Sequence, residues 1–192
     1  GYAKGGMPDT SVTVWQIQVL RLASTLDMEG VPEALRKSRQ WLNEMTNDDG
    51  LVGFQARMDY PNGPDAQTAA GLNAWLMIQS VPGMGNDAIA QRMDGLKGKQ
   101  SAHLRDRAGR KSNTGEETDL YYWYWAGPTI LSAEDWDRFN AALKDAILKG
   151  QSKKGSWNND DQWSVYGGEI YTTSMAVLTL QIYYRNPALR VD

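Results

Sequence analysis

Residues 65–80, DAQTAAGLNAWLMIQS, decide the fold that this sequence favours. The stretch opens with an acid and continues with threonine, small residues and large apolar residues on nearly every side of a helix. A helix that is apolar all round has to be buried on most of its sides. Three further segments share this layout: residues 9–24 (DTSVTVWQIQVLRLAS), 117–132 (ETDLYYWYWAGPTILS) and 169–184 (EIYTTSMAVLTLQIYY).

The four segments recur at a nearly constant interval. They start at residues 9, 65, 117 and 169, which gives a period of about 50 residues. Such a period is typical of stacked copies of one supersecondary unit, none of which can bury its apolar face alone. The sequence therefore predicts one repeat domain that spans residues 1–192.

Segments of a second kind lie between these four. Residues 31–45 (VPEALRKSRQWLNEM) have proline in the first turn, and residues 132–151 (SAEDWDRFNAALKDAILKGQ) have a serine N-cap followed by acids. Residues 86–100 are a weaker third copy because two glycines interrupt them. One apolar stripe is expected on each of the first two helices: Leu35, Trp41, Leu42 and Met45 on one, and Trp136, Phe139, Leu143, Ile147 and Leu148 on the other.

Buried helices thus alternate with helices that have one charged face. Four inner and three outer helices in antiparallel pairs predict an all-α double layer, and no strand pattern of credible length is present.

Composition limits the possible functions. The 192 residues are 41% hydrophobic with a net charge of -3, which fits a globular domain without a basic footprint for nucleic acid. No apolar run reaches the roughly 18 residues that a membrane span needs. With zero cysteines there is no disulfide, thiol nucleophile or thiolate ligand, and we expect no cofactor. The start without methionine suggests a segment of a longer protein, so no localisation is inferred.

The stretch GQSKKGSWNNDDQW, residues 150–163, allows two interpretations. Its acids Asp160 and Asp161 suggest an active-site loop, whereas the spacing of Gln151, Gly155 and Trp157 suggests a structural clamp between helices.

The same spacing resembles the QW motif of squalene and oxidosqualene cyclases. The segments 117–132 and 166–186 also resemble the repeats of bacterial squalene-cyclase-like and prenyltransferase-like proteins. The resemblance implies a partial α/α toroid, roughly half of a six-hairpin ring. It also implies that the side chain of Gln151 caps a neighbouring helix end, that Trp157 stacks against it and that Gly155 permits the turn. Residues 46–54 (TNDDGLVGF) look like a degenerate first copy, with Gly50 and Phe54 in the turn and aromatic places.

The chemistry of that superfamily is mostly missing from these residues. The cyclase acid motif Asp-x-Asp-Asp has only NNDD, residues 158–161, as a counterpart, and an alkene needs a strongly activated acid. The prenyltransferase zinc site needs Asp, Cys and His ligands, but the chain has no cysteine and the single histidine His103. We expect His103 to be a solvated residue of a basic loop.

Residues at the starts of the inner helices would ring one mouth of a toroid: Asp9, Thr10, Asp65, Thr68, Thr118, Asp119, Tyr171, Thr172 and Thr173. They are either helix caps or a polar rim for a sugar, peptide or cation, with Asp65 and Asp119 as candidate acid/base carboxylates. Tyr121, Trp123 and Trp125 are either core or the wall of a binding cavity.

The leading hypothesis is a non-catalytic binding or interaction domain that uses its inner-helix surface. Its partner would be another domain of the same longer chain or a second copy that closes the toroid. The alternative is an enzyme, either cyclase-like with its acid outside this segment or a carbohydrate-active lyase or hydrolase.

Overall fold

A computed structural model describes residues 6–107, 119–129, 133–157, 161 and 163–185. Every regular element among these residues is a helix, joined by turns with isolated β-bridges, so the predicted all-α class is confirmed. The chain divides into two compact units, Gly1–His103 and Leu104–Asp192, which are described separately below.

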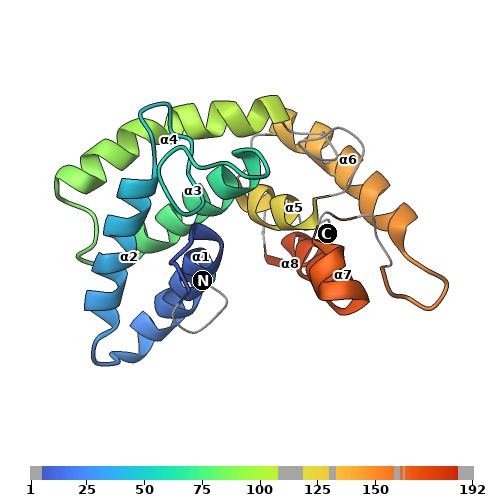
Figure 1. The fold of residues 1–192 in the computed structure, drawn as a ribbon, viewed down its shortest axis with the longest axis horizontal. Coiled ribbons are helices and arrows are strands. Elements are labelled where there is room, and N and C mark those ends of the chain that lie inside the picture. The colour runs from blue at the N-terminus through green and yellow to red at the C-terminus, as the bar shows by residue number, and fades with distance from the viewer. Residues whose placement is uncertain (1–5, 108–118, 130–132, 158–160, 162, 186–192) are drawn as a thin grey trace. The chain divides into compact units, whose positions relative to one another are not determined.

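The N-terminal unit is built around a buried helix. It contains α1 (Thr10–Ala23), a 3₁₀ turn η1 (Ser24–Leu26), α2 (Val31–Met45), α3 (Asp65–Gln79) and most of α4 (Ala88–Arg107). Helix α1 packs against both α2 and α3 (Figure 1). All residues from Asp65 to Trp75 are buried, as expected for an inner helix.

The C-terminal unit has a shorter inner helix. It contains α5 (Leu120–Ala126), a 3₁₀ turn η2 (Gly127–Thr129), α6 (Ala133–Gly150), α7 (Ser164–Leu180) and α8 (Ile182–Arg185). Helix α5, yellow in Figure 1, packs against α7, and every one of its residues is buried.

Pro128 and Gly168 make the helices differ in length from those that the sequence predicts. The α-helix expected over residues 117–132 ends at Ala126, because Pro128 has no N–H group and its ring collides with the preceding turn. Helix α7 is kinked at Gly168, whose φ of 58° and ψ of -159° are not helical. The sequence predicts an inner helix from residue 169. Helix α7 begins earlier, with one additional helical turn at Ser164–Gly167 before the kink.

The outer helices follow their predicted stripes with one exception. Helix α2 spans the predicted residues, and its Leu35 and Leu42 are fully buried. On α6, Phe139, Leu143 and Ile147 are buried as well, but Leu148 is 63% exposed. The prediction was wrong for Leu148 because consecutive helical residues point about 100° apart, which takes it off the stripe.

The same tight turn follows α2 and α6. Residues 46–52 close an antiparallel bridge between Thr46 and Val52, and residues 151–157 close one between Gln151 and Trp157. Each turn contains one glycine in the left-handed region, Gly50 with a φ of 86° and Gly155 with a φ of 87°. Only glycine adopts this conformation without strain.

Each turn is bonded to the inner helix that follows it. The backbone N–H of Val52 donates to the Thr68 hydroxyl at 3.1 Å, and that of Trp157 donates to the Thr173 hydroxyl at 3.1 Å. The residues that make these two bonds correspond at an interval of 105 positions. Trp157 lies 105 residues after Val52, and Thr173 lies 105 residues after Thr68. The unit α2–turn–α3 is therefore repeated as α6–turn–α7. Val52, and not Phe54 as predicted, occupies the place of Trp157.

The two turn glycines give a matched test of the repeat. We expect Gly155→Ala to lower the free energy of unfolding by about 1 kcal/mol, because only the left-handed backbone is strained. A Cβ at Gly155 would meet no atom within 4 Å. Gly50→Ala should cost about 2 kcal/mol or more, because its Cβ would lie 2.9 Å from Cγ of Gln100. Urea denaturation of both variants measures the difference, and equal losses would contradict this account.

Candidate functional site

Two of the predicted carboxylates cap inner helices. Asp9 precedes α1 and accepts hydrogen bonds from the backbone N–H of Val12 at 2.8 Å and from the Ser11 hydroxyl at 2.6 Å. Asp119 precedes α5 and accepts from the N–H of Tyr122 at 2.8 Å. Both carboxylates are buried, and in these positions they satisfy orphan N–H groups at the helix starts.

The predicted rim threonines hold the two turns. Thr10 donates its hydroxyl to the carbonyl of Gly53 at 2.7 Å, and Thr68 accepts from Val52. In the other unit, Thr172 donates to the carbonyl of Trp157 and Thr173 accepts from the N–H of the same residue. Thr10, Thr68 and Thr172 are fully buried, Tyr171 is half-buried, and Thr118 lies outside the described residues.

The aromatic run of α5 packs inside its own unit. Trp123 lies with its ring centroid 4.8 Å from that of Phe139 on α6. Trp125 meets Tyr121 edge-on at 6.1 Å and Tyr124 at 4.8 Å. Tyr121, Trp123 and Trp125 are all buried, so their observed contacts are those of a packed core.

The turn of residues 151–157 stabilises a helix end through its tryptophan. The Gln151 amide is exposed and donates within its own turn, to the carbonyl of Gly155 at 3.2 Å. Trp157 is buried, and its indole N–H donates to the carbonyl of Ile147 at 2.7 Å, in the last turn of α6. Carbonyls there lack an intrahelical partner. The prediction that Gln151 caps a neighbouring helix is therefore wrong, and Trp157 has that role.

Asp161 is a buried linking group. Its carboxylate accepts from the backbone N–H of Leu120 at 2.8 Å and from that of Trp163 at 2.7 Å. It thus joins the start of α5 to the segment that leads into α7, where it satisfies two N–H groups. Asp160 lies outside the described residues.

Asp65 forms a side-chain pair that the sequence did not reveal. Its Oδ1 lies 2.7 Å from Nε2 of His103, and the side chains of Asp65 and His103 are 7% and 19% exposed. The prediction of a solvated loop histidine is wrong because α4 continues to Arg107. A signal was present in the chain: Leu96, Gln100 and His103 keep the i, i+4, i+7 spacing of a helix face beyond the predicted end.

The Asp65–His103 pair has the chemistry of an orienting carboxylate and an acid/base group. A buried carboxylate that is hydrogen-bonded to an imidazole fixes the orientation of the ring. Asp65 also stands in the first turn of α3, where the helix dipole favours a negative charge. Within the described ranges, no group of three or more His, Cys, Asp and Glu residues could hold a metal ion.

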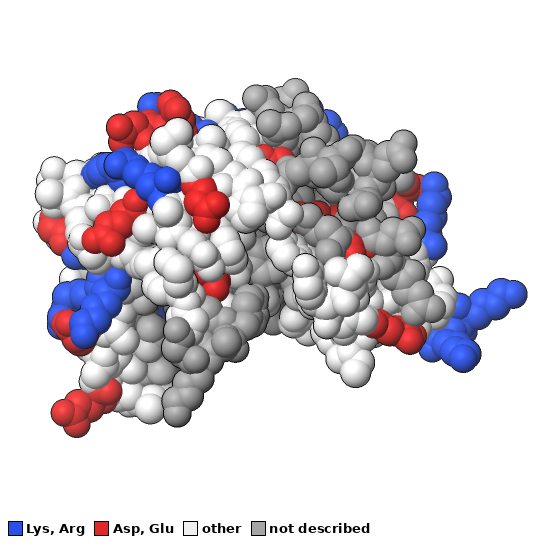
Figure 2. Space-filling view, in the orientation of Figure 1, with Lys and Arg blue, Asp and Glu red and all other residues white. Residues whose placement is uncertain are grey.

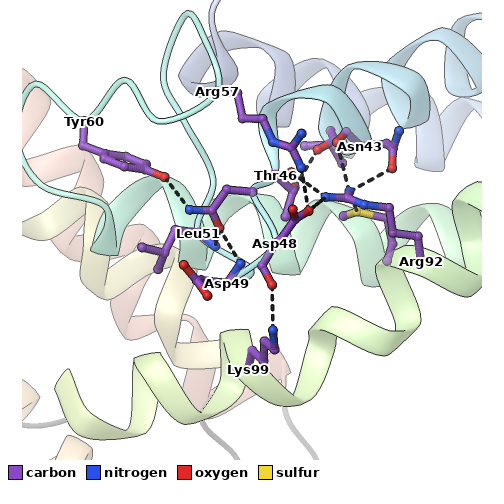
Figure 3. Close-up of polar contacts among 12 residues, drawn as sticks. Asn43, Thr46, Asp48, Asp49, Leu51, Arg57, Tyr60, Arg92 and Lys99 are labelled. Atoms are coloured by element: carbon purple, nitrogen blue, oxygen red, sulfur yellow. Dashed lines mark hydrogen bonds and ion pairs between the residues drawn. The ribbon is translucent and has the colours of Figure 1, made fainter.

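A polar network connects the turn of residues 46–52 to helix α4 (Figure 3). The Asp48 carboxylate contacts Arg57 at 2.9 Å and Arg92 of α4 at 3.0 Å. Arg92 also donates to the carbonyl of Thr46 at 2.9 Å, and Lys99 donates to the carbonyl of Asp48 at 2.7 Å. Figure 2 shows acidic and basic side chains interspersed on this view of the N-terminal unit. The contacts fasten the turn to the outer helix.

Three comparisons with known proteins found no match. No protein-family model matches the chain, and neither the curated proteins nor the solved structures include a significant match. No described helix combines the length and the apolar content that crossing a membrane requires.

The Asp48 network predicts a measurable titration. The hydrogen bond from Arg92 and the positive charge of Arg57 hold the pKa of the Asp48 carboxyl below its usual value. Because this pKa is lower in the folded chain, the contact stabilises above the unfolded-state pKa and is lost as the pH falls through the folded-state pKa. We expect Arg92→Gln to raise the Asp48 pKa more than Arg57→Gln, measured by NMR titration. A larger effect of Arg57→Gln would contradict the assignment.

The Asp65–His103 contact can be measured by a double-mutant cycle. We expect Asp65→Asn and His103→Gln to show a coupling energy of about 1–3 kcal/mol, because the carboxylate is buried and hydrogen-bonded. The control is the more exposed pair Asp94 and Lys97, whose side chains are 40% and 35% exposed. There, Asp94→Asn and Lys97→Gln should couple by about 0.5 kcal/mol or less. Urea denaturation of the four variants in each cycle provides both values. Similar couplings would mean that Asp65 and His103 are neighbours without a specific interaction.

Proposed function

We propose that this chain is a non-catalytic interaction domain, built from helical hairpins like those of squalene-cyclase-like and prenyltransferase-like repeat proteins. The support for a repeat is the matched turn geometry at Gly50 and Gly155, with the same threonine bond in each unit. The support for a structural role of the rim is that Asp9, Thr10 and Asp119 bond to the backbone around the helix starts.

The exposed apolar side chains of α1 and α7 carry this proposal. On α1, Val19 and Leu22 are 62% and 59% exposed, and on α7, Ile170 and Val177 are 82% and 45% exposed. In α3, Leu72 is buried and all of α5 is buried. Helices α1 and α7 belong to the predicted inner class. Exposed apolar faces on such helices mark sites of protein association. The partner is a further domain of a longer chain or a second copy.

A matched pair of substitutions tests whether the apolar face of α7 packs in the chain's own core or is free to bind a partner. Val177 in α7 corresponds to Leu72 in α3 through the 105-residue repeat. We expect Leu72→Asp to cost more than about 4 kcal/mol, because it buries an unpaired charge. Val177→Asp should cost less than about 1 kcal/mol in dilute protein, because water reaches the site. Urea denaturation measures both, and a Val177→Asp loss as large as that of Leu72→Asp would assign this face to the chain's own core.

A second candidate function rests on the Asp65–His103 pair. An oriented imidazole beside a buried carboxylate suits acid/base chemistry on a sugar, with Asp65 as the orienting residue. A panel of glycosidic substrates tests this candidate. Turnover that both Asp65→Asn and His103→Gln abolish supports an enzyme, whereas turnover that survives in both variants excludes this pair from the chemistry.

A further inference from the structure

Helix α7 and its continuation α8 carry an exposed stripe with regular spacing. Ile170, Val177 and Tyr184 follow one another at intervals of seven residues and are 82%, 45% and 78% exposed. The small residue Ser174 lies between the first two and is exposed as well. Gln181, which joins the two helices, keeps right-handed helical dihedrals. A seven-residue repeat on one side of a helix is the pattern of a seam against another helix.

The first repeat shows what covers the corresponding stripe. Ile170, Val177 and Tyr184 correspond to Asp65, Leu72 and Gln79 of α3. The first and last of these contact α4: Asp65 meets His103, and Gln79 meets Asp94 and Lys97. Early residues of α3 thus meet late residues of α4 and the reverse, so the covering helix is antiparallel.

The chemistry of the α7 stripe differs from that of its counterpart. The segment 170–184 contains no charged residue, whereas the α3 stripe pairs Asp65 with His103. A covering helix therefore needs an apolar stripe and no complementary charge. Ile170 and Tyr184 also lie at equal distances in sequence on either side of Val177.

That symmetry makes the stripe complementary to itself. If two α7 helices lie antiparallel around a two-fold axis at Val177, each Ile170 meets the other copy's Tyr184. Val177 then meets Val177, and Ser174 leaves room for the two backbones to approach. A two-fold interface requires this kind of self-complementary surface.

We propose that the stripe of Ile170, Ser174, Val177 and Tyr184 is a homodimer interface, occupied by α7 of a second copy. The inference rests on the proposed interaction function and names its partner. The pairing repeats, between two chains, the antiparallel cover that α4 gives α3 within one chain. It also removes Ile170, Val177 and Tyr184 from water.

Single cysteines test the pairing and its register, since the chain has no cysteine of its own. Val177→Cys should form a disulfide-linked dimer under mild oxidation, because two residues on the axis come within the roughly 7 Å between Cα atoms that a disulfide allows. Ile170→Cys should not link to itself, because its own copy lies 14 helical residues away, or about 21 Å. A mixture of Ile170→Cys and Tyr184→Cys should link the two variants to each other.

The matched control is Val165→Cys, which is 80% exposed on the same helix before the Gly168 kink. We expect Val177→Cys to cross-link roughly tenfold faster or more, because docking raises the local thiol concentration. In sedimentation equilibrium, the unmodified chain should be a dimer, Ile170→Asp a monomer and Val165→Asp still a dimer.

The outcomes separate this inference from the proposed function. Equal cross-linking rates of Val177→Cys and Val165→Cys, or a monomeric unmodified chain, would overturn the homodimer. If Val177→Asp still folds stably in that case, the interaction face stands and its partner is not a second copy. If Val177→Asp unfolds the chain as Leu72→Asp does, both proposals fail together.

Discussion

The hydrogen bond from a turn N–H to a threonine on the next inner helix is the contact on which both units depend. Val52 makes it to Thr68, and Trp157 makes it to Thr173. In each turn, a glycine in the left-handed conformation, Gly50 or Gly155, helps to bring the chain back beside the helix. The bond from Val52 to Thr68 is buried, so its loss would leave a buried N–H group without this partner.

The bonding of the turns to the inner helices explains why most of the predicted rim residues form structural hydrogen bonds. Thr10, Thr68 and Thr172 are buried against the turns, and Asp9 and Asp119 satisfy N–H groups at helix starts. Asp65 differs from these two, because its side chain reaches across to another helix and meets His103. That contact makes Asp65 an orienting residue for the His103 imidazole.

The repeat also shows which apolar surface is exposed to solvent. A helical repeat buries its apolar face only against a neighbouring element. In α3 the corresponding side contacts α4, whereas in α7 Ile170 and Val177 are exposed. The absence of charge between residues 170 and 184 makes this surface suited to an apolar partner helix.

The sequence by itself determined the all-α class, the burial of α3 and nearly the full extent of α1, α2 and α3, because helical period and caps are local properties. Local patterns gave too long a helix at α5, where Pro128 ends it. They also missed the donor role of Trp157 and the pairing of His103 with Asp65, which lie 38 residues apart. Only the tertiary structure decided these, because a side chain's partner depends on which helices are packed together and in which direction they run.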